Sequence, residues 1–132
     1  MITAVDTNVL LDVFLNDRVF GAPSAERLRT CLAEGTLVAC DIVWTETASA
    51  FPEAGDFLKA MHTLGVHYSE VKTEAAMLAA TAWRTYREAG GKRTRLAADF
   101  LIGAHAKVQC DRLLTRDRGV YRSYFPGLAL VV

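Results

Sequence analysis

Four isolated acidic residues in this chain have the chemistry of metal ligands or of general acids and bases: Asp6, Glu46, Asp99 and Asp117. Asp6 follows the apolar run that begins at Ile2, and such a run predicts a short buried strand. Asx and Thr side chains after a strand can end it and cap the next helix. In an open parallel sheet, ligands bind beyond the carboxyl ends of the strands, so Asp6 is predicted at a binding edge. Its alternative role is that of a turn residue or helix cap.

Glu46 is the only charged residue between Asp41 and Glu53, within a segment that we predict to be helical over residues 42–51. A solvated helix face normally carries more than one charge. A buried carboxylate without a partner is costly, and a bound metal ion would remove that cost. The alternative is one exposed glutamate on a helix of small residues.

Asp99 lies near the N-terminal end of a predicted helix over residues 96–108, among apolar neighbours. The helix macrodipole favours an anion there, and this stabilisation alone is the alternative explanation. Gly103 stands one helical turn further on. Because glycine inside a helix costs about 1 kcal/mol against alanine, we interpret Gly103 as leaving open space above the carboxylate.

Asp117 follows the predicted strand at residues 113–114, which places it at the same sheet edge as Asp6. Thr115 could hydrogen-bond a nearby carboxylate and hold its orientation. The alternative is a turn, because the sequence Thr-Arg-Asp-Arg-Gly has the composition of one.

Other acids serve as tests of this pattern. Asp111 precedes its strand and therefore belongs to the opposite edge of the sheet, and Asp41 is explained as a helix N-cap. Asp12 lies one helical turn beyond Asn8 and is a second-tier candidate for the site.

Four carboxylates that converge without paired lysines would repel one another strongly. An all-oxygen site of this kind suits a hard divalent cation, and we expect Mg²⁺ or Mn²⁺. Such a site can activate water and stabilise charge on a phosphodiester. An EF-hand is excluded because the acids do not share one loop. Zinc is not expected because the histidines have no ligand-like spacing: His62, His67 and His105.

Predicted strands alternate with predicted helices along the chain. The strands are expected at residues 2–5, 37–40, 66–69, 113–114 and 128–132. The helices are expected at residues 8–15, 23–32, 42–51, 57–64, 73–88 and 96–108, with a turn and a short helix at 117–125. This order predicts the α/β class, with a parallel sheet covered by helices on both faces.

The chain has 132 residues, of which 52% are hydrophobic and 23% charged, and its formal net charge is zero. This length and composition predict one domain over residues 1–132. Zero net charge argues against a strongly basic protein that coats phosphates, although a local basic rim can surround an acidic site. Three cysteines without a CxxC spacing, no signal peptide and no apolar run of about 20 residues indicate a cytoplasmic protein without a membrane span.

The stretches VDTNVLLD, WTE, ADFLIGAHA and LLTRDRGVYRSYFPGL occur in this order and together resemble the PIN-domain ribonucleases. They are most similar to the VapC-type toxins of bacterial and archaeal toxin–antitoxin pairs. The resemblance covers essentially the whole chain. It implies a three-layer α/β/α sandwich with a five-stranded, mainly parallel sheet.

The resemblance matches the family's acidic metal-binding quartet to four residues of this chain: Asp6, Glu46, Asp99 and Asp117. Asn8 and Thr115 match the polar positions that orient the quartet. The implied activity is hydrolysis of RNA phosphodiester bonds with Mg²⁺ or Mn²⁺, in which the four acids are catalytic. The implied partners are RNA, a cognate VapB-like antitoxin that inserts into or covers the active groove, and a second copy of the chain in a homodimer.

RNA phosphates need a positive rim around an acidic centre. Basic residues flank two of the acids in sequence: Lys92, Arg93, Arg95, Arg116, Arg118 and Arg122. Among them we select the RNA-binding candidates Arg93, Arg95, Arg116 and Arg118, with solvation or a salt bridge as the alternative for each. Tyr121, Tyr124 and Phe125 could stack on bases, although aromatic residues before a terminal strand are more often core.

Two other functions remain open. A nucleophilic Asp6 would suggest a phosphatase, but the second Asp that such chemistry usually has two residues on is here Asn8. The other alternative is a non-catalytic α/β module that binds protein or RNA. Apolar side chains that could serve an interface are Leu58, Met61 and Trp83.

Overall fold

The computed structural model describes residues 1–92 and 97–132, and in them strands alternate with helices. The strands are β1 (Ile2–Val5), β2 (Thr36–Cys40), β3 (Val66–Ser69), β4 (Arg112–Leu114) and β5 (Leu130–Val131). The helices are α1 (Thr7–Phe14), α2 (Gly21–Glu34), α3 (Asp41–Ala48), α4 (Ala54–Leu64), α5 (Thr73–Glu88), α6 (Ala98–Gln109) and α7 (Gly119–Tyr124). The predicted alternation is therefore confirmed, with ends that differ from the expected ones by a few residues.

All five strands belong to one sheet with the order β3-β2-β1-β4-β5, and every neighbouring pair is parallel. Ala4 of β1 lies opposite Val38 of β2 on one side and Leu113 of β4 on the other. The chain builds outward from β1 to β3 and then returns to place β4 on the other side of β1. The strand order thus reverses between β1 and β4, which is the position where open parallel sheets bind ligands.

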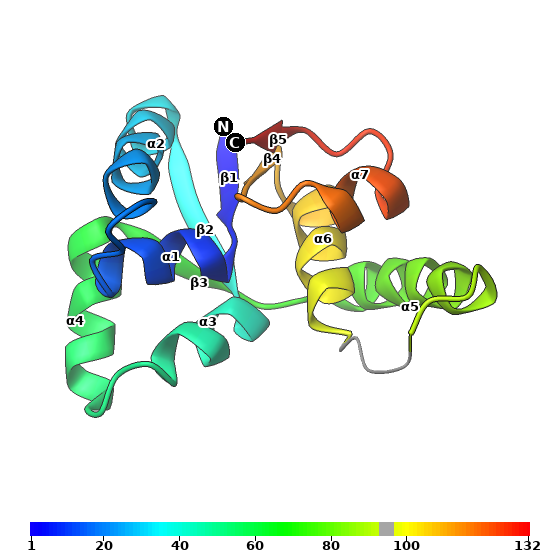
Figure 1. The fold of residues 1–132 in the computed structure, drawn as a ribbon, viewed down its shortest axis with the longest axis horizontal. Coiled ribbons are helices and arrows are strands. Elements are labelled where there is room, and N and C mark those ends of the chain that lie inside the picture. The colour runs from blue at the N-terminus through cyan, green and yellow to red at the C-terminus, as the bar shows by residue number, and fades with distance from the viewer. Residues whose placement is uncertain (93–96) are drawn as a thin grey trace.

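Helices cover both faces of the sheet, as predicted. In Figure 1, α1, α2 and α4 lie on one side of the strands, and α5, α6 and α7 lie on the other. Helix α3 lies at one end of the sheet and contacts both α1 and α6 (Figure 1). Within the ranges 1–92 and 97–132, no helix combines the length and the apolar character that crossing a membrane requires.

The core lies between the sheet and the two helical layers. Val5, Leu37 and Leu113 are fully buried on the central strands, and Phe100 of α6 is fully buried against them. Helix α5 packs against α6, and three small residues of α5 are buried: Ala75, Ala79 and Ala82.

Two helix ends show how far local signals determine the structure. Gly65 ends α4 with a φ of 74°, as predicted, because glycine adopts this left-handed conformation at little cost. The prediction that Asp41 caps α3 is wrong. Cys40 occupies the cap position without a side-chain hydrogen bond, and Asp41 stands in the first turn, where the macrodipole favours its charge.

Gly103 has a packing role and does not leave open space above Asp99. A Cβ atom at Gly103 would lie 2.5 Å from Cε2 and 2.7 Å from Cδ2 of the buried Phe125 ring. The Phe125 ring, which follows α7, therefore occupies the space that a side chain at position 103 of α6 would need. Our interpretation of Gly103 as an access residue is corrected by this contact.

Gly103→Ala is expected to destabilise the protein by about 1–3 kcal/mol, because overpacking a filled core displaces neighbouring groups. The matched control is Gly55→Ala in α4, where nothing lies within 4 Å of the new Cβ. That change should be neutral or stabilise the protein by up to about 1 kcal/mol through helix propensity. Urea unfolding midpoints measure both, and equal stability of the two variants would contradict the packing role.

Candidate active site

Asp6 follows β1 directly and is the N-cap of α1, so the helix-cap role considered from the sequence is real. Its Oδ1 atom accepts a hydrogen bond from the Thr7 backbone N–H at 2.7 Å. Its Oδ2 atom accepts bonds from the Thr115 hydroxyl at 2.7 Å and from the Tyr121 hydroxyl at 2.9 Å. The capping hydrogen bond therefore uses Oδ1, and Oδ2 is held by two residues from the C-terminal part of the chain.

Asp6 is only 5% exposed. Burial raises the pKa of Asp6 to about 6, and the nearby charge of Asp99 adds to this rise. The three hydrogen bonds act in the opposite direction, because they stabilise the carboxylate. Ionised Asp6 is thus held in a fixed geometry at an energetic cost that a neighbouring cation would offset.

Glu46 reaches the same end of the sheet from α3. Its Oε1 atom accepts a hydrogen bond from the Thr7 hydroxyl at 2.7 Å, and Thr7 is the residue whose N–H binds Asp6. Glu46 is exposed to solvent, as its alternative explanation required. The structure nevertheless joins it to Asp6 through a single residue.

Asp99 lies half-buried in the first turn of α6, and Asp117 lies exposed in the loop after β4. The charges of Asp99 and Asp117 both raise the pKa of the Tyr121 hydroxyl, after the larger effect of its burial and beside that of Asp6. Two hydrogen bonds from backbone N–H groups position Asp117. Its Oδ1 atom accepts the Gly119 N–H at 3.1 Å, and its own N–H donates to Thr115 Oγ1 at 3.0 Å. Both acids thus act electrostatically on the Asp6–Tyr121 pair.

Asn8 and Thr115 connect the loop of Asp117 to the start of α1. The Nδ2 atom of Asn8 lies 3.5 Å from Thr115 Oγ1, and its Oδ1 atom accepts the Arg116 backbone N–H at 3.3 Å. Thr115 itself is buried and donates its hydroxyl to Asp6. The two polar positions therefore hold the ends of β1 and β4 together at the reversal of the strand order.

The contact between Tyr121 and Asp6 is what the sequence did not reveal. Tyr121 and Phe125 are both buried, so the core role that the sequence favoured is confirmed for them and base stacking is not available to them. The Tyr121 ring packs in the core, while its hydroxyl reaches Asp6 from 115 positions along the chain. No local spacing signals such a contact, because it depends on where α7 packs after β4.

The basic residues fall into three groups. Arg93 and Arg95 lie outside the described residues. Arg116 forms two hydrogen bonds with the buried carboxylate of Asp12, from Nε at 2.6 Å and from Nη2 at 3.0 Å. The remaining basic residues are exposed: Lys92, Arg118 and Arg122. Arg116 therefore forms the salt bridge considered as its alternative role, and its partner is Asp12.

Asp111 and His105, which are both expected to lie outside the site, have other contacts. Asp111 is exposed at the opposite edge of the sheet, where its Oδ2 accepts the Ile2 backbone N–H at 2.6 Å. His105 is buried, and its Nε2 atom lies 2.9 Å from the Ser69 hydroxyl. Burial lowers the pKa of His105, which keeps the ring neutral and structural.

The donor set at the acid edge fits a hard divalent cation. Asp6, Glu46, Asp99 and Asp117 supply carboxylate oxygen atoms, which are the ligands that Mg²⁺ and Mn²⁺ prefer. Within the described part of the chain, no three Asp, Glu, His or Cys side chains are gathered closely enough to enclose an ion directly. The acids instead surround the buried Asp6, whose pKa is raised mainly by burial and further by the charge of Asp99.

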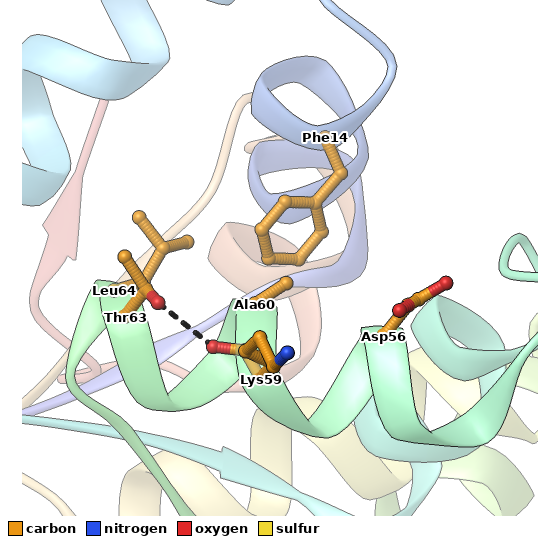
Figure 2. A pocket seen from close by; sticks show the side chains of 6 residues that line it. All are labelled: Phe14, Asp56, Lys59, Ala60, Thr63 and Leu64. Atoms are coloured by element: carbon orange, nitrogen blue, oxygen red, sulfur yellow. Dashed lines mark hydrogen bonds between the residues drawn. The ribbon is translucent and has the colours of Figure 1, made fainter.

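An apolar groove runs between α1, α2 and α4, separate from the acids. One hollow has a volume of about 350 Å³. Figure 2 shows the residues that line it, with the Phe14 ring pointing toward Ala60 of α4. Around this hollow α4 contributes Asp56, Lys59, Ala60, Thr63 and Leu64. A second hollow of about 260 Å³ shares Thr63 and Leu64 with the first and is otherwise lined by Val13, Ala25, Leu28, Arg29 and Leu32. Phe14 is at the opposite end of α1 from Asp6, so the groove and the acid edge are distinct surfaces.

The fold and the order of these residues match a known protein family. The model of the PIN domain family matches residues 3–126, which is nearly the whole chain. The chain belongs to the PIN domain family. The acids of the site thus lie within a PIN fold, as the sequence resemblance implied. A comparison with curated protein sequences finds no match.

Solved structures confirm the fold at low sequence identity. A chain of VapBC2 from Rickettsia felis, bound to a DNA fragment from their promoter, has a TM-score of 0.76 at 15% identity and covers 99% of this chain and 98% of that one. A toxin–antitoxin complex from Klebsiella pneumoniae has a TM-score of 0.67 at 19% identity, with coverage of 98% and 96%. VapC20 from Mycobacterium tuberculosis, a toxin that cleaves the sarcin–ricin loop, has a TM-score of 0.59 at 15% identity, with coverage of 92% and 94%. These similarities show that the chain has the fold of VapBC proteins.

Proposed function

We propose that this PIN domain is a metal-dependent endoribonuclease of the VapC type. The observation that carries the proposal is the buried carboxylate of Asp6 at the reversal of strand order, next to the charge of Asp99. Glu46 and Asp117 are tied to the same place through Thr7 and Thr115. An acidic centre at this position suits phosphodiester hydrolysis.

The chain's own residues have separate roles in this proposal. Asp6, Glu46, Asp99 and Asp117 would hold Mg²⁺ or Mn²⁺. When bound, such a cation supplies the Lewis acidity that activates water and neutralises charge on the phosphate. Thr115 and Tyr121 fix the orientation of Asp6, and Asn8 fixes the loop that carries Asp117.

RNA is the substrate that we infer. VapC20, which shares the fold, cleaves the sarcin–ricin loop. Exposed basic side chains that flank the acids in sequence would contact phosphates: Lys92, Arg118 and Arg122. Arg93 and Arg95 stay in the proposal as RNA-binding candidates on the strength of the sequence alone.

The phosphatase alternative finds less support. Phosphatase chemistry of this kind usually has a second Asp two residues on as general acid, and the amide of Asn8 cannot supply that proton. Asn8, at the position of a general acid, instead bonds to the Arg116 backbone.

An antitoxin partner and a homodimer complete the proposal. The Klebsiella pneumoniae structure that shares the fold is a toxin–antitoxin complex. The apolar groove between α1, α2 and α4 would suit an apolar segment of an antitoxin. Leu58 and Met77 are exposed and available for protein contacts, whereas Met61 belongs to the core and Trp83 packs partly against it. We also propose that residues 1–132 form one domain. A cytoplasmic location is proposed as well, since all three cysteines are free.

The test is cleavage of a mixed pool of structured and single-stranded RNAs in the presence of Mg²⁺, Mn²⁺ or EDTA. We expect internal cuts with either cation and none with EDTA. Cutting that persists in EDTA would overturn the metal dependence. If no RNA is cut and calorimetry detects no Mn²⁺ binding, the acids do not form a metal site and the proposed function is wrong.

A further inference from the structure

A third hollow opens beside the candidate active site. It has a volume of about 460 Å³ and is lined by Val19, Phe20, Pro23, Ser24, Arg27, Arg116 and Val132. We call it the α2 cleft. Arg116 stands between Thr115 and Asp117 in the chain, and its backbone N–H donates to Asn8 at 3.3 Å. One lining residue of the cleft is therefore adjacent in sequence to Asp117, and its backbone is bonded to Asn8.

One wall of the α2 cleft is a guanidinium held in a single orientation. Asp12 binds the Nε and Nη2 atoms of Arg116, and Asp12 itself accepts the Ser24 hydroxyl at 2.7 Å. The Arg116 Cζ atom lies 3.9 Å from the centre of the Phe20 ring. Within the described part of the chain, the Nη1 atom of Arg116 makes no hydrogen bond. The geometry thus leaves donors on a fixed, planar cation available to a ligand.

The apolar wall of the cleft is exposed yet also fixed. Val19 is 69% exposed and Phe20 is 41% exposed. The Oδ1 atom of Asp17 accepts the backbone N–H groups of both residues, at 2.9 Å and 2.8 Å. Because this loop is already ordered, a ligand that stacks on Phe20 loses little conformational freedom in the protein.

A second cation lies on the same cleft. Arg27 of α2 is half-buried and lines the hollow. In the described ranges 1–92 and 97–132, it forms no ion pair, whereas the charge of Arg116 is matched by Asp12. Arg27 is therefore the cation of the cleft whose charge is available to a phosphate.

We propose that the α2 cleft binds one nucleotide of single-stranded RNA next to the scissile phosphate. The base stacks on the part of the Phe20 ring that Arg116 leaves exposed, the Nη1 donor of Arg116 binds an acceptor of the nucleotide, and the phosphate pairs with Arg27. Aromatic rings and arginine planes are the surfaces on which proteins stack unpaired bases. The cleft volume lies within the range of small-molecule sites. The inference rests on the proposed function and deepens it by assigning a substrate contact outside the acids.

The test measures the affinity of a labelled single-stranded RNA for protein that carries Asp99→Asn, which prevents cutting. In this background Phe20→Ala and Arg27→Ala are each expected to weaken binding by about tenfold. Arg27→Ala should also reduce the slope of log affinity against log salt concentration by about the amount that one phosphate contact contributes. The matched control is Arg29→Ala on the same helix, because Arg29 is exposed, pairs with Glu26 at 3.0 Å and lines the other groove.

The outcomes separate the inference from the proposed function. Unchanged RNA affinity in both cleft variants, together with Mg²⁺-dependent cutting by the unmodified protein, would overturn the cleft and leave the nuclease. That result would assign the hollow to a protein partner. No RNA binding by the Asp99→Asn protein and no cutting by the unmodified protein would overturn both. Thermal melts of each variant verify that the fold is retained.

Discussion

Asp99→Asn is expected to lower metal-dependent RNA cleavage by about 100-fold or more while the fold is retained. The expected loss is large because cation-assisted activation of water supplies several kcal/mol of the rate acceleration. The fold should tolerate the change because Asn has nearly the same shape as Asp. Removing the charge also relieves repulsion, since Asp99 contributes to the raised pKa of Asp6. Cleavage rates with Mg²⁺ and far-UV circular dichroism measure the two effects.

The matched control for Asp99→Asn is Asp56→Asn. Asp56 is also an aspartate in the first turn of a helix, but it lies on α4 beside the apolar groove. Both substitutions remove the same favourable interaction with a helix macrodipole. Full activity in the Asp56 variant together with loss in the Asp99 variant would locate the effect at the acid edge. Full activity in both would remove Asp99 from the proposed site.

The sequence predicts the placement of two candidate acids well because the carboxyl ends of parallel strands share one edge. Asp6 follows β1 and Asp117 follows β4, and these strands are neighbours at the reversal of the order. The same logic assigns Asp111 correctly to the opposite edge. Alternation of apolar strands with helices is enough for this prediction, since it needs no knowledge of individual contacts.

The contacts that hold these acids could not be predicted. Tyr121 reaches Asp6, and Arg116 reaches Asp12, across 115 and 104 positions of the chain. Each pair forms only after the sheet has placed β4 beside β1, and no periodicity records which long side chain fills which gap. Arg116 shows the consequence, because its position next to a candidate acid in sequence gives no sign that Asp12 fixes its guanidinium group. Gly103 is a second example, because its contact with Phe125, which follows α7, could not be predicted from the local sequence.

Asp6→Asn is expected to change how stability depends on pH in metal-free buffer. The pKa of Asp6 is raised to about 6 from its usual 3.8, so between these values the folded protein binds a proton more tightly than the unfolded chain. The group's contribution to stability is therefore most favourable below about pH 4 and is lost as pH rises through about 6. Since one pKa unit corresponds to 1.36 kcal/mol, the loss amounts to about 2–3 kcal/mol. The Asp6→Asn variant cannot lose it, because Asn does not ionise.

The quantity to measure is the difference in free energy of unfolding between the Asp6→Asn variant and the unmodified protein across this pH range. Hydrogen bonds lost by Asn from Thr115 or Tyr121 shift the difference by a constant, whereas the ionisation of Asp6 gives it a slope. In urea titrations with EDTA, the free energy of unfolding of the variant should increase relative to that of the unmodified protein as pH rises. A flat difference would mean that Asp6 ionises as an ordinary carboxyl group.

Adding Mg²⁺ at neutral pH should then stabilise the unmodified protein and leave the variant nearly unchanged. A ligand that binds only the folded state stabilises it by RT ln(1 + [L]/Kd), which is about 2.7 kcal/mol at a hundredfold excess over Kd. Because ionised Asp6 is buried beside another acid, its cost is the energy that a bound cation would relieve. Equal stabilisation of both proteins by Mg²⁺ would place the cation elsewhere, even if RNA cleavage requires it.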